Sequence, residues 1–154
     1  MTTEDFLHAA LHVDLETVKK YVEAGIDIDV VDKNGATALI LAILNRGNRP
    51  VTMLLNAGMN VNVKDEDGKT AVMRAAKNSD NTLLSLLLSH GADVNLVDMD
   101  GMAALMYAAQ RANVDNVKAL LAAGANTSLK NNKGQTAVII AQEKGRSKII
   151  AALQ

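Results

Sequence analysis

The chain has 154 residues, of which 49% are hydrophobic and only 2% aromatic, and its formal net charge at pH 7 is -1. This composition is too apolar for a disordered chain, and the near-neutral balance gives no reason to expect nucleic acid or an anionic membrane as a partner. The absence of cysteine excludes disulfides, thiolate metal sites and thiol nucleophiles.

A period of 33 residues organises the sequence. Glycines recur at 35, 68, 101 and 134, and a second glycine series at 25, 58, 91 and 124 has the same spacing. Series that stay in register along a chain predict a tandem array. We expect one domain, residues 1–154, with its units in this order: an N-terminal cap unit 1–31, full units 32–64, 65–97 and 98–130, and a C-terminal cap unit 131–154.

Each unit carries the same signals in the same order. A tight turn that ends in glycine comes first, as at Asp67-Gly68, and a short apolar helix follows. A threonine is placed to cap this helix in three units, at Thr37, Thr70 and Thr136. After a polar break, a second amphipathic helix ends at the second glycine series. Helices this short cannot bury their apolar faces alone, so the pattern predicts an all-α solenoid of antiparallel helix pairs stacked in a curved array.

This pattern resembles the ankyrin repeat. Residues 65–76, DEDGKTAVMRAA, are similar to the first half of the family motif, and residues 87–95, LLSHGADVN, are similar to the second half. The resemblance covers the whole chain as about five repeats, the outer two incomplete, and implies hairpin-like loops between the helix pairs. The sequence departs from the family's Thr-Pro-Leu-His segment, because Ala replaces Pro and Ile or Met replaces His in every unit. We therefore expect apolar contacts in place of the family's Thr–His hydrogen bond.

No motif for catalysis or metal binding stands out. The Gly68-Lys69-Thr70 segment lacks the upstream glycine of a phosphate-binding loop. His8 and His12 have the spacing of a metal-binding pair on a helix, but the sequence offers no third ligand. We expect no enzyme activity, no cofactor and no bound metal.

The resemblance implies that a protein partner binds the concave face, through the turn tips and the exposed sides of the first helices. The candidate contact residues come from the third and fourth units: Glu66, Asp67, Arg74, Lys77, Met99, Met102, Tyr107 and Arg111. We expect the fourth unit to be the contact centre, because Tyr and Arg are frequent at interface hot spots and Met adapts to irregular surfaces. Tyr107→Ala with Arg111→Ala should weaken partner binding by about 2 kcal/mol or more and leave stability nearly unchanged.

These observations predict a monomeric, non-catalytic protein–protein interaction module. Two alternatives stay open: an inhibitor or immunity protein that blocks the active site of a partner enzyme, and a structural fragment of a larger scaffold. No apolar run is long enough to span a membrane, and the acidic N-terminus is unlike a signal peptide. We expect a cytoplasmic location, or a periplasmic or secreted one in case a signal peptide has been removed.

Overall fold

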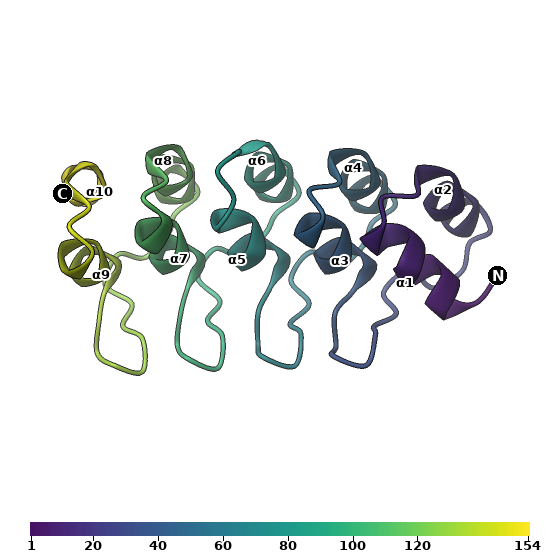
Figure 1. The fold of residues 1–154 in the computed structure, drawn as a ribbon, viewed down its shortest axis with the longest axis horizontal. Coiled ribbons are helices and arrows are strands. Elements are labelled where there is room, and N and C mark those ends of the chain that lie inside the picture. The colour runs from purple at the N-terminus through teal and green to yellow at the C-terminus, as the bar shows by residue number, and fades with distance from the viewer.

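The computed structural model describes residues 1–154 and contains ten α-helices arranged in five antiparallel pairs. The helices are α1 (Thr3–Leu11), α2 (Leu15–Glu23), α3 (Ala38–Leu44), α4 (Asn48–Asn56), α5 (Ala71–Ala76), α6 (Thr82–Ser89), α7 (Ala104–Arg111), α8 (Val114–Ala122), α9 (Ala137–Glu143) and α10 (Ser147–Leu153). The odd-numbered first helices form one row and the even-numbered second helices form another (Figure 1). Hairpin-like loops project from the row of first helices, away from the second helices. The predicted all-α repeat solenoid is confirmed.

Threonine caps start two of the first helices as predicted. Thr37 accepts a hydrogen bond from the backbone N–H of Ile40 at 3.3 Å, and Thr136 accepts one from Ile139 at 3.4 Å. Such side chains satisfy N–H groups that have no partner within the helix. The cap predicted at Thr70 is wrong, because its hydroxyl is buried and forms no hydrogen bond.

The loop inside each helix pair turns on a residue with positive φ, except in the third unit. The φ angles are 61° at Val13, 56° at Arg46, 59° at Ala112 and 64° at Gly145. In the third unit the loop has no such residue. There α6 begins at Thr82, whose backbone N–H donates to Oδ1 of Asp80 at 2.9 Å. Only glycine adopts this region without steric cost, so the turn at the β-branched Val13 is strained.

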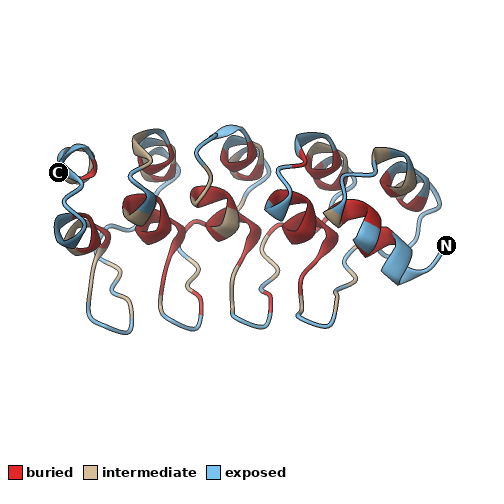
Figure 2. Ribbon diagram, viewed as in Figure 1, coloured by how far each residue is buried: buried red, intermediate tan, exposed pale blue.

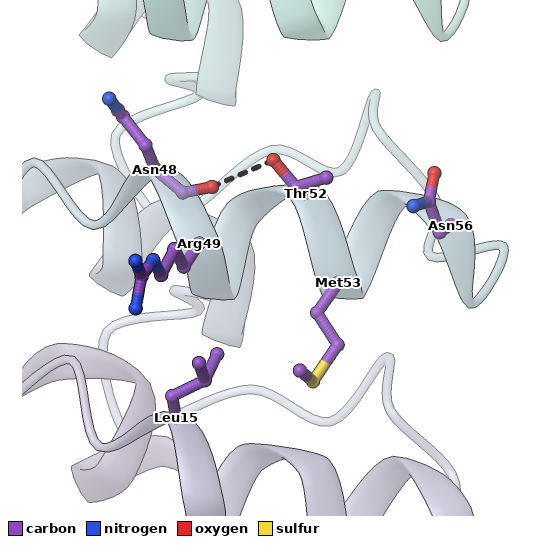
Figure 3. Close-up of a pocket in the computed structure, with 6 residues that line it drawn as sticks. All are labelled: Leu15, Asn48, Arg49, Thr52, Met53 and Asn56. Atoms are coloured by element: carbon purple, nitrogen blue, oxygen red, sulfur yellow. Dashed lines mark hydrogen bonds between the residues drawn. The ribbon is translucent and has the colours of Figure 1, made fainter.

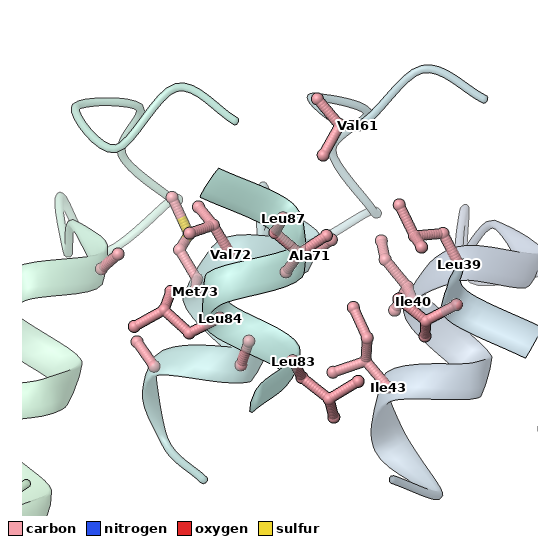
Figure 4. Close-up of a cluster of buried hydrophobic side chains, with 14 of the residues drawn as sticks. Leu39, Ile40, Ile43, Val61, Ala71, Val72, Met73, Leu83, Leu84 and Leu87 are labelled. Atoms are coloured by element: carbon pink, nitrogen blue, oxygen red, sulfur yellow. The ribbon is translucent and has the colours of Figure 1, made fainter. Parts of the chain in front are cut away.

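A continuous apolar core runs between the two rows of helices (Figure 2). Alanines that recur with the 33-residue period are fully buried and let the first helices approach closely: Ala42, Ala75, Ala108 and Ala141. Figure 4 shows Ile40 and Ile43 of one unit lying against Ala71 and Leu83 of the next unit. Apolar contact therefore fills the position of the family's histidine, and burying each such aliphatic side chain stabilises the fold by about 1.5–3 kcal/mol.

Each hairpin is closed by the side chain of its first residue. The Oδ1 atom of Asp65 accepts the backbone N–H groups of Asp67 at 3.0 Å and Lys69 at 2.9 Å. The equivalent first residues of the other hairpins make the same two bonds: Asp32, Asp98 and Asn131. The hairpins, residues 32–36, 65–69, 98–102 and 131–135, are thus closed in the same way, and the aspartate of the first three has one carboxylate oxygen left over.

Neighbouring hairpins are joined through their backbones. Three N–H groups each donate to a carbonyl of the preceding hairpin, at 2.9 or 3.0 Å, and they belong to Glu66, Met99 and Asn132. The contact leaves no room for a side chain at Gly101, where a Cβ atom would lie 2.8 Å from the Oδ1 atom of Asn132. At Gly134, in the last hairpin, a Cβ atom would meet nothing within 4 Å.

The segments that close the units form a second ladder of hydrogen bonds. Asp29, Asn62 and Asn95 each accept, through Oδ1, a backbone N–H from the next unit, at 3.0, 2.8 and 2.8 Å respectively. These polar side chains therefore serve to join the repeats.

Candidate protein-binding face

The residues predicted for partner binding lie on the hairpins and on the sides of the first helices next to them. We call this surface the inner face and define it by its hairpin tips, 33–36, 66–69, 99–102 and 132–135, together with three positions on or directly after each of the helices α3, α5, α7 and α9. These positions are Leu41, Leu44 and Asn45; Arg74, Lys77 and Asn78; Tyr107, Gln110 and Arg111; and Ile140, Glu143 and Lys144.

The side chains of Arg74 and Tyr107 hold the first helices to the hairpins. The Nη2 atom of Arg74 donates to Oδ2 of Asp65 at 2.6 Å, the oxygen that the turn leaves free. One unit later, the hydroxyl of Tyr107 donates to Oδ2 of Asp98 in the same way. Two unlike side chains thus perform the same anchoring task at equivalent positions.

Tyr107 and Met102 are buried, with only 6% and 7% of their surfaces exposed. The expectation that they lie exposed on the binding face is therefore wrong. The ring of Tyr107 lies under the ammonium group of Lys77, with 4.1 Å from Nζ to the ring centroid. Burial, together with the hydrogen bond and charge of Asp98, raises the pKa of Tyr107 well above its ordinary value. Both residues support the surface from beneath.

Lys77 lies in a cluster of cationic side chains. Burial lowers its pKa, and the positive charges of Lys69, Arg74 and Arg111 lower it further, against the opposing charge of Asp98. The four cations come from the hairpin before α5, from α5 and the residue after it, and from the end of α7.

The remaining candidates reach solvent. Met99 is 71% exposed at the tip of its hairpin, and the side chains of Arg111, Glu66 and Asp67 are exposed as well. Asp67 forms an ion pair with Lys69 at 3.5 Å. The exposure of these residues agrees with the sequence analysis, and their contact with a partner stays a prediction.

A sequence model of ankyrin repeats (three copies) matches residues 6–98 and 73–154. The chain belongs to the ankyrin-repeat family. No curated protein matches the sequence significantly. Ankyrin repeats are generally protein–protein interaction modules and are typically non-catalytic. The resemblance inferred from the 33-residue period is thus confirmed.

The inner face of this ankyrin array has a hollow at its N-terminal end that the sequence analysis did not identify. Its volume is about 530 Å³, and its apolar lining comes from Leu7, Leu11, Val31 and Leu41. The first repeat has no hairpin of its own, so the 33-residue pattern of hairpins did not place α1 beside the inner face. The apolar residues at successive turns of α1 were the available signal.

A second hollow, of about 470 Å³, lies between α2 and α4 on the row of second helices (Figure 3). Leu15 and Met53 supply its apolar surface, and Arg49 is its one charged residue. Thr52 donates its hydroxyl to the carbonyl of Asn48 at 2.8 Å. No group of polar side chains converges there on a common point.

The two histidines of α1 are used within their own helix. Their rings stack with centroids 4.0 Å apart, and Nδ1 of His12 bonds to the carbonyl of His8 at 2.9 Å. Nowhere in the ankyrin array do three or more acidic or histidine side chains gather as metal ligands would. All ten helices fall short of the length and apolar character that a membrane crossing requires.

Proposed function

We propose that this ankyrin-repeat chain is a non-catalytic module that binds a protein partner on its inner face. The observation that supports this most is the contrast between two sets of positions. Residues that join the units, such as the buried alanines, recur in every repeat, whereas a solvent-accessible position at the end of the first helix is Leu44, Lys77, Gln110 and Glu143 in turn. Stacking places no single demand on this position, which leaves its chemistry free to fit a partner.

The accessible contact residues of this face are Met99, Arg111, Lys77, Glu66 and Asp67. Met99 supplies an exposed and adaptable apolar side chain. Tyr107 and Met102 contribute by holding the helix and hairpin that carry the contact residues.

The proposal is tested by affinity capture from a lysate of the source cells, with quantitative mass spectrometry. The inner-face variant carries Leu44→Glu and Met99→Glu, both at exposed positions, so that its fold is preserved. A matched variant carries Ser85→Glu and Ala122→Glu on the exposed sides of α6 and α8. Thermal unfolding of all three proteins shows whether the variants are folded.

We expect the original chain and the Ser85/Ala122 variant to capture the same protein, and the Leu44/Met99 variant to fail to capture it. Capture that survives the inner-face changes but is lost with the matched changes contradicts the proposal. The identity of the partner then separates the two alternatives. An enzyme whose activity the chain suppresses supports the inhibitor, and a partner that binds without change in its activity supports the interaction module or scaffold.

A further inference from the structure

The helical part of the inner face carries cations without matching acids. The three central first helices, α3, α5 and α7, contain no aspartate or glutamate. Arg74 and Lys77 lie on or directly after α5, and Arg111 ends α7. The acidic residues of this region are confined to the hairpins.

Two of the clustered cations are neutralised and two are not. Arg74 bonds to Asp65 at 2.6 Å, and Lys69 pairs with Asp67 at 3.5 Å. Neither Lys77 nor Arg111 forms an ion pair.

The nearby Asp98 is not free to pair with either cation. Its Oδ1 atom accepts two backbone N–H groups of its own hairpin, and its Oδ2 atom accepts the hydroxyl of Tyr107. The ring of Tyr107 then occupies the underside of Lys77. Lys77 and Arg111 therefore hold positive charge that no ion pair within the protein neutralises.

The first-helix positions of the inner face change from cationic to apolar toward the N-terminus, where the hollow beside α1 also has Glu4, Asp32 and Lys33 in its lining. Leu44 takes the position of Lys77 and is 51% exposed, and Val31 is 47% exposed beside the hollow of about 530 Å³. Leu41 takes the position of Arg74 and lines the same hollow. A ligand that follows the array thus meets apolar surface first and positive charge next.

We propose that the inner face binds an extended acidic segment of a partner protein. Its carboxylates lie over Lys77 and Arg111, and an apolar side chain enters the hollow between α1 and α3. This inference rests on the proposed function and adds the chemistry of the partner. Neighbouring helices pack about 10 Å apart, and an extended chain covers that distance in about three residues. The hollow lies about two and a half helix spacings from Arg111, so the apolar residue and the farther acidic residue of the segment are about seven or eight residues apart.

The surface favours an acidic peptide over nucleic acid. Glu66, Asp67 and Asp100 are exposed at the hairpin tips and repel any anionic ligand that crosses them, so such a ligand must follow the row of first helices. Single-stranded nucleic acid also needs exposed aromatic rings for stacking, and Phe6, Tyr21 and Tyr107 are all buried. The acidic tips likewise direct an acidic peptide along the helices.

The test is selection from a random peptide-display library against the full chain. Selected peptides are labelled, and their Kd is measured by fluorescence anisotropy for the original chain and for the variant Lys77→Gln with Arg111→Gln. A matched variant, Lys20→Gln with Lys118→Gln, removes two exposed positive charges from α2 and α8. Each peptide is also made with amides in place of its carboxylates. Arg111→Gln alone, at an exposed position, serves if the double variant does not fold.

We expect acidic peptides with an apolar residue toward one end. Removing Lys77 and Arg111, or removing the carboxylates of the peptide, should each weaken binding about tenfold, and the two changes together should weaken it no further. The Lys20/Lys118 variant should bind like the original chain. Lys77→Arg, which keeps the positive charge, should retain most of the affinity.

Three results contradict the inference. The first is a set of peptides whose binding is lost in the Leu44→Glu, Met99→Glu variant but which are not enriched in acidic residues. This result overturns the inference of an acidic partner and leaves the proposed function standing. Peptides that bind only the second helices, or no peptides at all, count against the proposed function itself. An oligothymidylate probe that binds the inner face more tightly than the acidic peptides assigns the surface to nucleic acid.

Discussion

The hydroxyl of Tyr107 donates a hydrogen bond to Asp98, and one unit earlier the same two positions hold the ion pair of Arg74 with Asp65. In both units the acidic side chain closes the hairpin with one oxygen and binds the first helix with the other. In these two units the position of the contact is the same and its chemistry differs. Leu41 and Ile140, at the same position in the second and last units, make no such bond.

The first prediction concerns the stability that this contact provides. Tyr107→Phe removes the hydroxyl and leaves one oxygen of the buried Asp98 without its partner, so we expect a loss of about 1–3 kcal/mol in the free energy of unfolding. Tyr107→Ala should cost about 3–5 kcal/mol, because it also leaves a cavity. Urea unfolding followed by circular dichroism measures both.

The matched control is Tyr21→Phe, because Tyr21 is equally buried and stacks on Phe6 at 4.1 Å, but its hydroxyl bonds to no protein group. A loss at Tyr107 no larger than the loss at Tyr21 would show that the bond to Asp98 adds no stability. This prediction replaces the expectation from the sequence that Tyr107→Ala leaves the fold nearly intact.

The second prediction concerns alkaline pH. Burial and Asp98 raise the pKa of Tyr107 above its ordinary value of 10.0. In the unfolded chain the phenol loses its proton near pH 10, whereas in the folded chain it keeps that proton. Its contribution to stability is therefore complete below about pH 10 and is lost as the pH rises further.

The quantity to measure is the difference in unfolding free energy between the original chain and Tyr107→Phe. It should stay constant from pH 7 to about 9 and then shrink by up to about 1.4 kcal/mol per pH unit above pH 10. Taking the difference removes the contributions of lysines that titrate in the same range. A difference that is flat or growing above pH 10 contradicts the environment assigned to Tyr107.

The third prediction compares two turn glycines with nearly equal backbone angles, φ +73° at Gly101 and +74° at Gly134. Both alanine variants lose stability through the left-handed backbone, by about 1 kcal/mol. Gly101→Ala should cost about 1–3 kcal/mol more, because its methyl group collides with Asn132 of the next hairpin. Equal losses at the two sites would mean that the hairpins are not in contact.

The fourth prediction concerns strain in the loop between α1 and α2. Val13→Gly relieves the positive φ at a β-branched residue, so we expect it to raise the unfolding free energy by about 1 kcal/mol. Gly145→Ala, at the equivalent position of the last unit, should lower it by a similar amount. Thermal unfolding of the two variants checks the pair, and a loss of stability at Val13→Gly would show that its side-chain contacts outweigh the strain.

The fold followed from the sequence because each recurring residue has a stacking role. Buried alanines, turn glycines and the first residue of each hairpin repeat every 33 positions, since every unit meets the same neighbour. Local departures from the repeat pattern could not be predicted from the sequence. Thr70 has the residue type of a helix cap, yet its hydroxyl is buried without a hydrogen bond, and the loop before α6 differs from the others.

The sequence predicted on which face the candidate residues lie, but not how deeply each side chain is buried. Helical spacing placed Arg74 and Tyr107 on the same face, and both do point to the hairpins. Spacing gives no information on what covers a side chain. Lys77, from a different repeat, covers the ring of Tyr107. The burial of Tyr107 therefore depends on the contact between the two repeats.

The most direct test of the inner face as the binding surface is hydrogen–deuterium exchange of the full chain with and without a captured partner. We predict slower exchange in the hairpins 65–69 and 98–102 and in the last turns of α5 and α7, with α4, α6 and α8 unchanged. Slower exchange confined to α2 and α4, around the hollow lined by Leu15 and Met53, with unchanged hairpins, would contradict it.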